Sequence, residues 1–273
     1  MDEPSRRLAQ AVREGDLGTM RALLDADPKL ANAAVELGER APRLVHLAIA
    51  EDQMGALRLL IERGADLNAR NGDGRLPLHD CFELARTEMA QVLLAAGAVP
   101  DVCAAAAYGL HQLLRELLRR KPKLANDLST GLSPLGWSAY GDEAESARIL
   151  IAAGAIVDRP PYDLEAWGPA SHVANTNVAR VLLEHGANPN CQDEEGDSPL
   201  HAAIKSRIVQ DPSPYIELLL GHGADPNIRN KAGRTALEEA ELQSAQDAEA
   251  CYPGRTPGAE RLARTVKALR AAR

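Results

Sequence analysis

The sequence predicts an all-α repeat solenoid, a stack of about eight helix–turn–helix units. Three recurring features predict this fold. A Gly-Ala pair returns along the chain, in places at a step of about 33 residues; its glycines are Gly64, Gly97, Gly154, Gly186 and Gly223. Two adjacent apolar residues precede each pair. A short helix-opening segment also recurs, as in Leu76–Asp80 and Ser198–Ala202.

The stretch from Asn71 to Asp101 shows one whole unit. Residues 71–74 tolerate positive φ, which suits a tight hairpin-like turn. Pro77 fits the first position of a short helix, because its φ is already helical and its missing N–H is not needed there. A second helix carries apolar residues at helical spacing and ends at Gly97. Two such helices expose an apolar face that only a neighbouring unit can cover.

These units resemble the ankyrin repeat, whose first helix opens with G-x-T-P-L-H and whose second helix is followed by G-A-D-x-N. The matching openings are residues 74–79 and 196–201, and the matching closing segments are residues 64–68 and 223–227. The resemblance covers nearly the whole chain, which we identify as an ankyrin repeat domain of bacterial type. It implies an ankyrin-like stack with short hairpin-like turns. The concave side of such a stack is lined by hairpin tips and by the exposed ends of the first helices.

We expect one ankyrin-like solenoid domain over residues 1–273. Its parts are an N-terminal cap repeat (1–34), internal repeats (35–227) and a C-terminal cap repeat with a basic last helix (228–273). Repeats 1 and 4 lack the hairpin and close with the same Pro-Lys-Leu-Ala-Asn segment, at 28–32 and at 122–126.

Repeats five to seven keep the hairpin region but depart from the motif in other ways. Repeat five (129–158) has Gly136 at the histidine position, and repeat six (160–190) has Trp167-Gly168-Pro169 where P-L-H would be. Repeat seven (193–227) carries an insertion between its helices.

Composition and charge exclude several function classes. The net charge of -8 argues against nonspecific nucleic-acid binding, which depends on Lys and Arg neutralising phosphates. The 4 cysteines lie far apart without a C-x-x-C pair, which speaks against a zinc site or a disulfide framework. No apolar run approaches membrane-spanning length, and the first residues show no secretory core. We therefore expect a cytoplasmic protein that binds neither nucleic acid nor membrane.

We expect no catalytic residue, cofactor or metal site. His46, His79 and His201 fall at the histidine position of the motif, where the resemblance implies an imidazole that hydrogen-bonds backbone near the hairpin. Cys103 and His111 fall on different helices, with no further ligand at a recognisable spacing. Ser133 lies in a faint nucleophile-like pattern, but no strand precedes it, and its hydroxyl suits a helix N-cap.

Aromatic residues gather in the irregular repeats four to six. The chain has eight aromatic side chains (Trp 2, Tyr 5, Phe 1). Five of them lie in these repeats: Tyr108, Trp137, Tyr140, Tyr162 and Trp167. Aligning the repeats places Glu83, Ala107, Tyr140, His172 and Lys205 in equivalent positions at the exposed end of the first helix. Exposed Tyr and Trp supply much contact area with few rotors. We therefore predict a partner-binding surface made of Tyr108, Trp137, Tyr140, Tyr162, Trp167, His172 and Glu83.

Three interpretations of this aromatic cluster stay open. The rings fill the space left by the missing hairpin and by Gly136, or they contact a partner protein. In the third interpretation they wall a notch in which His172 acts as an acid–base group.

Two function hypotheses follow from these interpretations. The first is a protein–protein interaction scaffold that binds a partner protein or peptide in the concave groove, with Glu83, Glu51 and Asp73 as an acidic rim that favours a basic partner. The alternative is a small-molecule-binding protein or enzyme with a pocket at repeats four to six.

Overall fold

The computed structural model describes residues 2–34, 43–158, 176–205, 212–249, 267 and 269–272. They fall into two compact units, Met1–Ala104 with Leu128–Gly131, and Ala105–Asp127 with Leu132–Arg273. Each unit is a stack of paired helices joined by short turns, which confirms the predicted all-α repeat fold. Within the described ranges, Ala34 and Arg43 form an isolated antiparallel β-bridge. That the two units form one continuous solenoid domain stays a prediction.

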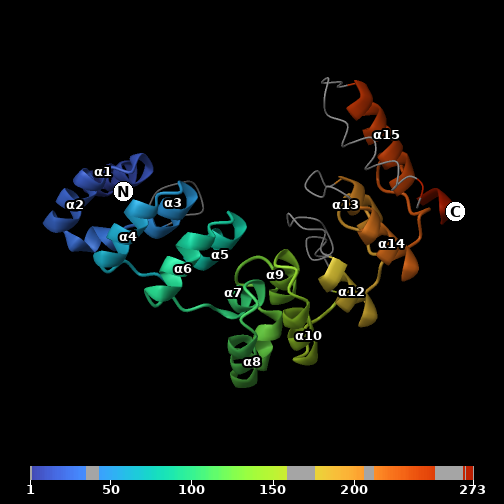
Figure 1. The fold of residues 1–273 in the computed structure, drawn as a ribbon, viewed down its shortest axis with the longest axis horizontal. Coiled ribbons are helices and arrows are strands. Elements are labelled where there is room, and N and C mark those ends of the chain that lie inside the picture. Colours follow the sequence, from blue (N-terminus) through green and yellow to red (C-terminus); the bar gives the residue numbers. More distant parts are fainter. Residues whose placement is uncertain are drawn as a thin grey trace. The chain divides into compact units, whose positions relative to one another are not determined.

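The first unit stacks its helical pairs in chain order. Their bounds are α1 (Glu3–Glu14), α2 (Leu17–Ala26), η1 (Pro28–Asn32), α3 (Leu44–Ala50), α4 (Met54–Glu62), α5 (Pro77–Glu83) and α6 (Thr87–Ala95). The first helices α1, α3 and α5 contact one another in succession, and so do the second helices α2, α4 and α6 (Figure 1). The apolar faces of the two rows meet and form the core of the unit.

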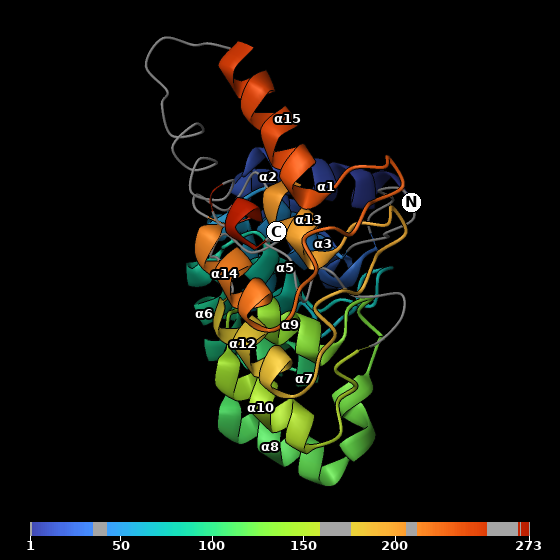
Figure 2. The same cartoon turned by 90° about the vertical axis from the view of Figure 1, so that its right-hand side faces the viewer.

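The second unit is built in the same way. Its elements are α8 (His111–Arg120), η3 (Pro122–Asn126), α9 (Pro134–Tyr140), α10 (Ala144–Ala152), α12 (Thr176–Glu184), α13 (Pro199–Lys205), α14 (Ser213–Gly221) and α15 (Ala236–Glu249), and α7 (Val102–Ala107) lies where the chain passes from one unit to the other. The second helices α8, α10, α12 and α14 follow one another as neighbours (Figure 2). None of the described helices has the length and apolarity needed to cross a bilayer.

Local sequence explains where several helices begin. The Asp2 side chain accepts the Ser5 N–H at 3.0 Å and caps α1. Ser133 caps α9 by accepting the Gly136 N–H at 3.1 Å, so its predicted role as an N-cap is confirmed. Both residues satisfy a backbone donor that the first helical turn leaves without a partner.

The turn between the two helices of a repeat places one residue in the left-handed region. That residue is Gly15, Asp52, Ala85, Gly109 or Asp142, with φ between 51° and 68°. The step from Asp52 to Ala85 equals the step from Gly109 to Asp142, and it is the ankyrin period of about 33 residues. The step from Ala85 to Gly109 is nine residues shorter. The missing hairpin of repeat four is therefore confirmed, and α7 follows α6 without one.

The chain just before α9 compensates for the hairpin that repeat four lacks. Residues 128–131 lie against the turn at 71–75 within the first unit, so close that a Cβ on Gly74 would lie 1.9 Å from the Ser129 carbonyl oxygen. Gly74 also has φ +75°, so both the lack of space and the backbone conformation require glycine at this position. Thr130, the residue after Ser129, is buried.

Leu150→Ala tests the predicted core. Leu150 is fully buried in α10, which contacts α8, α9 and α12. Removing its side chain loses apolar burial and leaves a cavity, so we expect a loss of about 2–5 kcal/mol in the free energy of unfolding by urea. Leu94→Ala, at a position that is 37% exposed on α6, is the control and should cost clearly less. A loss under about 1 kcal/mol for Leu150→Ala would contradict the assigned packing.

Ala85→Gly tests the left-handed turn. Ala85 has φ 55° and an exposed side chain, so its Cβ adds strain without adding buried area. We expect the glycine variant to be more stable by about 0.5–1 kcal/mol in urea unfolding, because the relief of strain exceeds the extra entropy of the unfolded chain. Gln91→Gly on the exposed face of α6 should instead cost about 0.5–1 kcal/mol. Destabilisation by both changes would rule out the assigned turn.

Candidate functional site

The histidines of the repeat motif tie one repeat to the next. The His46 Nε2 lies 2.9 Å from the Ala69 carbonyl oxygen, and its Nδ1 lies 2.6 Å from Asp80 Oδ2. The His201 Nε2 lies 2.9 Å from the Arg234 carbonyl oxygen, and its Nδ1 accepts the Ser198 N–H. All of these rings are buried. The predicted bond from the imidazole to hairpin backbone is confirmed at both positions.

His79 shows what happens where the next hairpin is missing. Its Nδ1 accepts the Leu76 N–H at 2.9 Å, so Nε2 carries the proton and donates to Asp101 Oδ1 at 3.1 Å. The Asp101 carboxylate thus replaces the backbone carbonyl that His46 and His201 use. It also accepts the Ala104 N–H at 2.9 Å at the start of α7 and pairs with Arg70 at 2.8 Å.

The surroundings of Asp101 lower its pKa. Burial alone would raise the pKa of this carboxyl, but the hydrogen bonds from His79, Ala104 and Arg70 outweigh it and bring the pKa down to about 2. The carboxylate is therefore ionised across the physiological pH range. It joins His79 of α5, the start of α7 and Arg70 of the segment before α5. Its role is structural.

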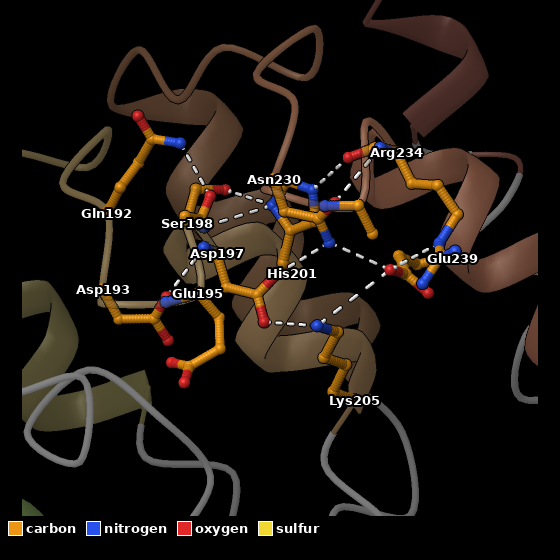
Figure 3. Close-up of polar contacts among 12 residues, drawn as sticks. Gln192, Asp193, Glu195, Asp197, Ser198, His201, Lys205, Asn230, Arg234 and Glu239 are labelled. Atoms are coloured by element: carbon orange, nitrogen blue, oxygen red, sulfur yellow. Dashed lines mark hydrogen bonds and ion pairs between the residues drawn. The ribbon is translucent and has the colours of Figure 1, made fainter.

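A polar cluster joins the last repeats of the second unit (Figure 3). The Asn230 amide donates to Asp197 Oδ1 and to Glu239 Oε1, both at 2.9 Å, and Arg234 Nε donates to the same Glu239 oxygen at 2.8 Å. Lys205 pairs with the other oxygen of Asp197. Burial would raise the pKa of Glu239, but the bonds from Asn230 and Arg234 lower it overall. Because its charges are paired, we interpret this cluster as a structural tie.

The position at the exposed end of the first helix pairs with the residue eight positions earlier, in the hairpin. In repeat three Glu83 pairs with Arg75, and in repeat seven Lys205 pairs with Asp197, so the charges are exchanged. Glu83 therefore already has a cation, although part burial raises its pKa against the influence of Arg75. In repeat five Tyr140 occupies the equivalent position.

Trp137 does not belong to a binding surface. Its side chain is fully buried within α9, although we expected it to contact a partner, and that expectation is corrected. Its ring centroid lies 5.8 Å from that of Tyr140 with the planes tilted by 38°, a favourable geometry for two aromatic rings. Trp137 therefore supports Tyr140 from the core side, as the core-filling interpretation predicted for this residue.

Tyr108 and Tyr140 are both half-buried, at the ends of α7 and α9 in the second unit. The turns that follow them approach closely, since a Cβ on Gly141 would lie 2.3 Å from the Ala107 carbonyl oxygen. The structure therefore brings these two predicted residues to adjoining turns. Glu83 belongs to the first unit, and Tyr162, Trp167 and His172 lie outside the described residues.

Sequence reasoning missed a polar pair beside the tyrosines. The His111 Nε2 lies 3.5 Å from Glu143 Oε2, and the Glu143 carboxylate lies against Gly109. His111 and Glu143 begin the second helices of neighbouring repeats, so only a register between repeats could have indicated the pair. In the part of the chain that the structure describes, no three His, Cys, Asp or Glu side chains gather as a metal site would require.

Asp101→Asn separates the charge of Asp101 from its shape. A pKa that is lower in the folded protein than in the unfolded chain stabilises the fold above the unfolded pKa of 3.8, and this stabilisation disappears as the pH falls toward 2. We expect the wild type to lose about 2 kcal/mol of unfolding free energy relative to Asp101→Asn between about pH 5 and pH 2. Urea unfolding of both proteins at several pH values measures the difference. A difference that does not change with pH would contradict the assigned bonds.

Comparison with known proteins supports the assignment of the fold. A family model described as ankyrin repeats (3 copies) matches residues 8–103 and 169–249, more than half of the chain. Ankyrin repeat and SOCS box protein 16 of Homo sapiens is 29% identical over 223 residues, which cover 71% of this chain and 47% of that protein. A probable E3 ubiquitin-protein ligase of Oryza sativa, XBOS32, is 35% identical over 88 residues, covering 32% of this chain and 17% of that one.

A solved structure, the human ASB11 ankyrin repeat domain, has a TM-score of 0.44 and 20% identity, covering 97% of both chains. This chain spans less than half of the length of the curated relatives it matches. The bacterial type expected from the sequence stays a prediction. From the repeated helical pairs, the histidine ties and the family match, the chain belongs to the ankyrin repeat family.

Proposed function

We propose that this chain binds a partner protein or peptide through the ends of α7 and α9, with Tyr108 and Tyr140 as the central contacts. Ankyrin repeat domains are generally protein-interaction modules. The observation that supports this particular surface is that two tyrosines remain partly exposed at adjoining turns of an otherwise Ala- and Leu-rich stack. Tyrosine contributes a large contact area and loses little rotamer entropy on binding.

The turns that carry the tyrosines are held in place from several sides. Trp137 packs behind Tyr140, and the Asp142 carboxylate accepts the Asn177 amide at 2.6 Å and the Val178 N–H at 3.2 Å. The close approach of Gly141 to Ala107 fixes the spacing between the two turns. A surface that is rigid before binding loses little entropy in forming a complex.

The predicted preference for a basic partner is not carried forward. Glu83 pairs with Arg75, and Glu51 lies 3.9 Å from Arg13, so the acidic rim is partly neutralised within the chain. The alternative of a small-molecule pocket, walled by Tyr108, Trp137, Tyr140 and Trp167 with His172 as an acid–base group, stays a prediction. Of these residues, Trp137 is buried, and Trp167 and His172 lie outside the described residues.

Affinity capture from lysate of the source organism tests the proposal. The baits are the wild type, Tyr108→Ala/Tyr140→Ala, and Ile156→Ala as a matched control, since Ile156 is an apolar side chain of the same unit that is 50% exposed. We expect a protein that the wild type and Ile156→Ala retain and that the double variant loses. With that protein purified, the double variant should bind about tenfold more weakly or worse.

Thermal unfolding of each bait supplies the folding control. A double variant that stays folded and retains every partner of the wild type would contradict the proposed surface.

A further inference from the structure

The chain uses the segment Pro-Lys-Leu-Ala-Asn twice, and both copies fold alike. Each forms a short 3₁₀ helix, η1 after α2 and η3 after α8. At the end of each copy, an asparagine side chain donates to the carbonyl oxygen of the next Gly-Ala pair, Asn32 to Gly64 at 3.3 Å and Asn126 to Gly154 at 2.8 Å. The backbone around the two copies can therefore be compared position by position.

An open groove lies at the second copy. It has a volume of about 560 Å³ and runs between α8 and α10 in the second unit. Leu118, Pro122 and Ile149 provide apolar lining, and Arg119 and Arg148 stand among them. The lining thus combines an apolar floor with cationic side chains.

The Asp25–Arg63 ion pair of the first copy has no counterpart at the equivalent positions of the second copy, where Arg115 and Glu145 join the two helices instead. The left-handed residues Gly15 and Gly109 align α2 with α8, and Asp52 and Asp142 align α4 with α10. In this alignment Asp25 of α2 corresponds to Arg119, and Arg63, which follows α4, corresponds to Ala153. Asp25 and Arg63 form an ion pair that bridges their helices. Arg119 and Ala153 cannot, because one is a cation and the other has no polar atom in its side chain.

The charges in the groove leave cationic capacity for a ligand. Glu145 is the acidic group in the lining and already pairs with Arg115 at 2.6 Å, with Arg148 farther away at 3.9 Å. Arg119 makes no ion pair with another described residue. Three arginines against one glutamate make the groove positive in a chain whose net charge is -8. Such a patch attracts acidic groups selectively.

We propose that the groove between α8 and α10 is a docking site for an acidic amphipathic segment of a partner protein. Carboxylates of that segment pair with Arg119 and Arg148, and its apolar side chains cover Pro122 and Ile149. Guanidinium groups bind carboxylates through paired hydrogen bonds, and the apolar floor adds affinity that a purely ionic ligand would not gain. This surface is formed by second helices and does not depend on the proposed role of Tyr108 and Tyr140.

Peptide selection tests the proposal with a defined probe. A random peptide library displayed on phage is selected on the wild type, with depletion on Arg119→Asp/Ala153→Arg, which transfers the ion pair of the first copy to the second. Enriched peptides are synthesised with a fluorescent label and measured by fluorescence polarisation. We expect Asp- and Glu-rich sequences that contain Leu, Ile or Phe, and binding that weakens as salt rises.

The variants separate the groove from other surfaces. Binding should weaken about tenfold or more in Arg119→Asp/Ala153→Arg and in Arg148→Ala. Arg58→Ala, at the equivalent position of the first copy, and Tyr108→Ala/Tyr140→Ala should leave it unchanged. Arg119→Ala gives a second readout that needs no new ion pair, and thermal unfolding checks each variant.

Three results of the peptide selection would overturn the proposal. They are enrichment without acidic sequences, acidic peptides that bind Arg119→Asp/Ala153→Arg as tightly as the wild type, and peptides whose binding is lost in Arg58→Ala. Binding of phosphatidylserine vesicles and, separately, binding of double-stranded DNA are measured in parallel. Binding of either one that depends on Arg119, without any selected peptide, would assign the groove to a lipid surface or to nucleic acid instead.

Discussion

The contact between successive repeats is the constraint on which the rest of the structure depends. One helical pair is too small to bury its own apolar face, so leucines such as Leu57, Leu93 and Leu150 become fully buried only when neighbouring pairs cover them. The polar ties follow the same contact. Motif histidines bond to the next hairpin, and asparagines at the ends of repeats bond to the next Gly-Ala pair. The sequence motif recurs because this contact recurs.

Repeat four shows how the contact is made without a hairpin. Without a hairpin, the chain loses the carbonyl oxygen that would accept the proton of His79, and Asp101 supplies a carboxylate in its place. Residues 128–131 occupy the space beside Gly74. A buried imidazole N–H without an acceptor is costly, so loss of the hairpin required a new acceptor at this point. The lowered pKa of Asp101 is a consequence of that requirement.

Both proposed surfaces lie at positions that differ in residue type between the repeats of this chain. The family model leaves residues 104–168 unmatched, and this segment contains Tyr108, Tyr140 and the arginine-lined groove. The exposed end of the first helix carries Glu83 in one repeat, Lys205 in another and Tyr140 between them. In the groove, Arg119 stands at the position that the acidic Asp25 occupies in the first copy.

The sequence by itself determined the repeat fold, the missing hairpin of repeat four and the structural role of the motif histidines. These features depend on local backbone geometry and on spacing along the chain, which a sequence displays directly. Only the tertiary structure decided that Trp137 belongs to the core and that the groove beside Arg119 is open. It also decided that Glu83 pairs with Arg75 and that Lys205 pairs with Asp197. Exposure and ion pairing depend on side chains brought together from different repeats. The spacing of residues within one repeat does not specify them.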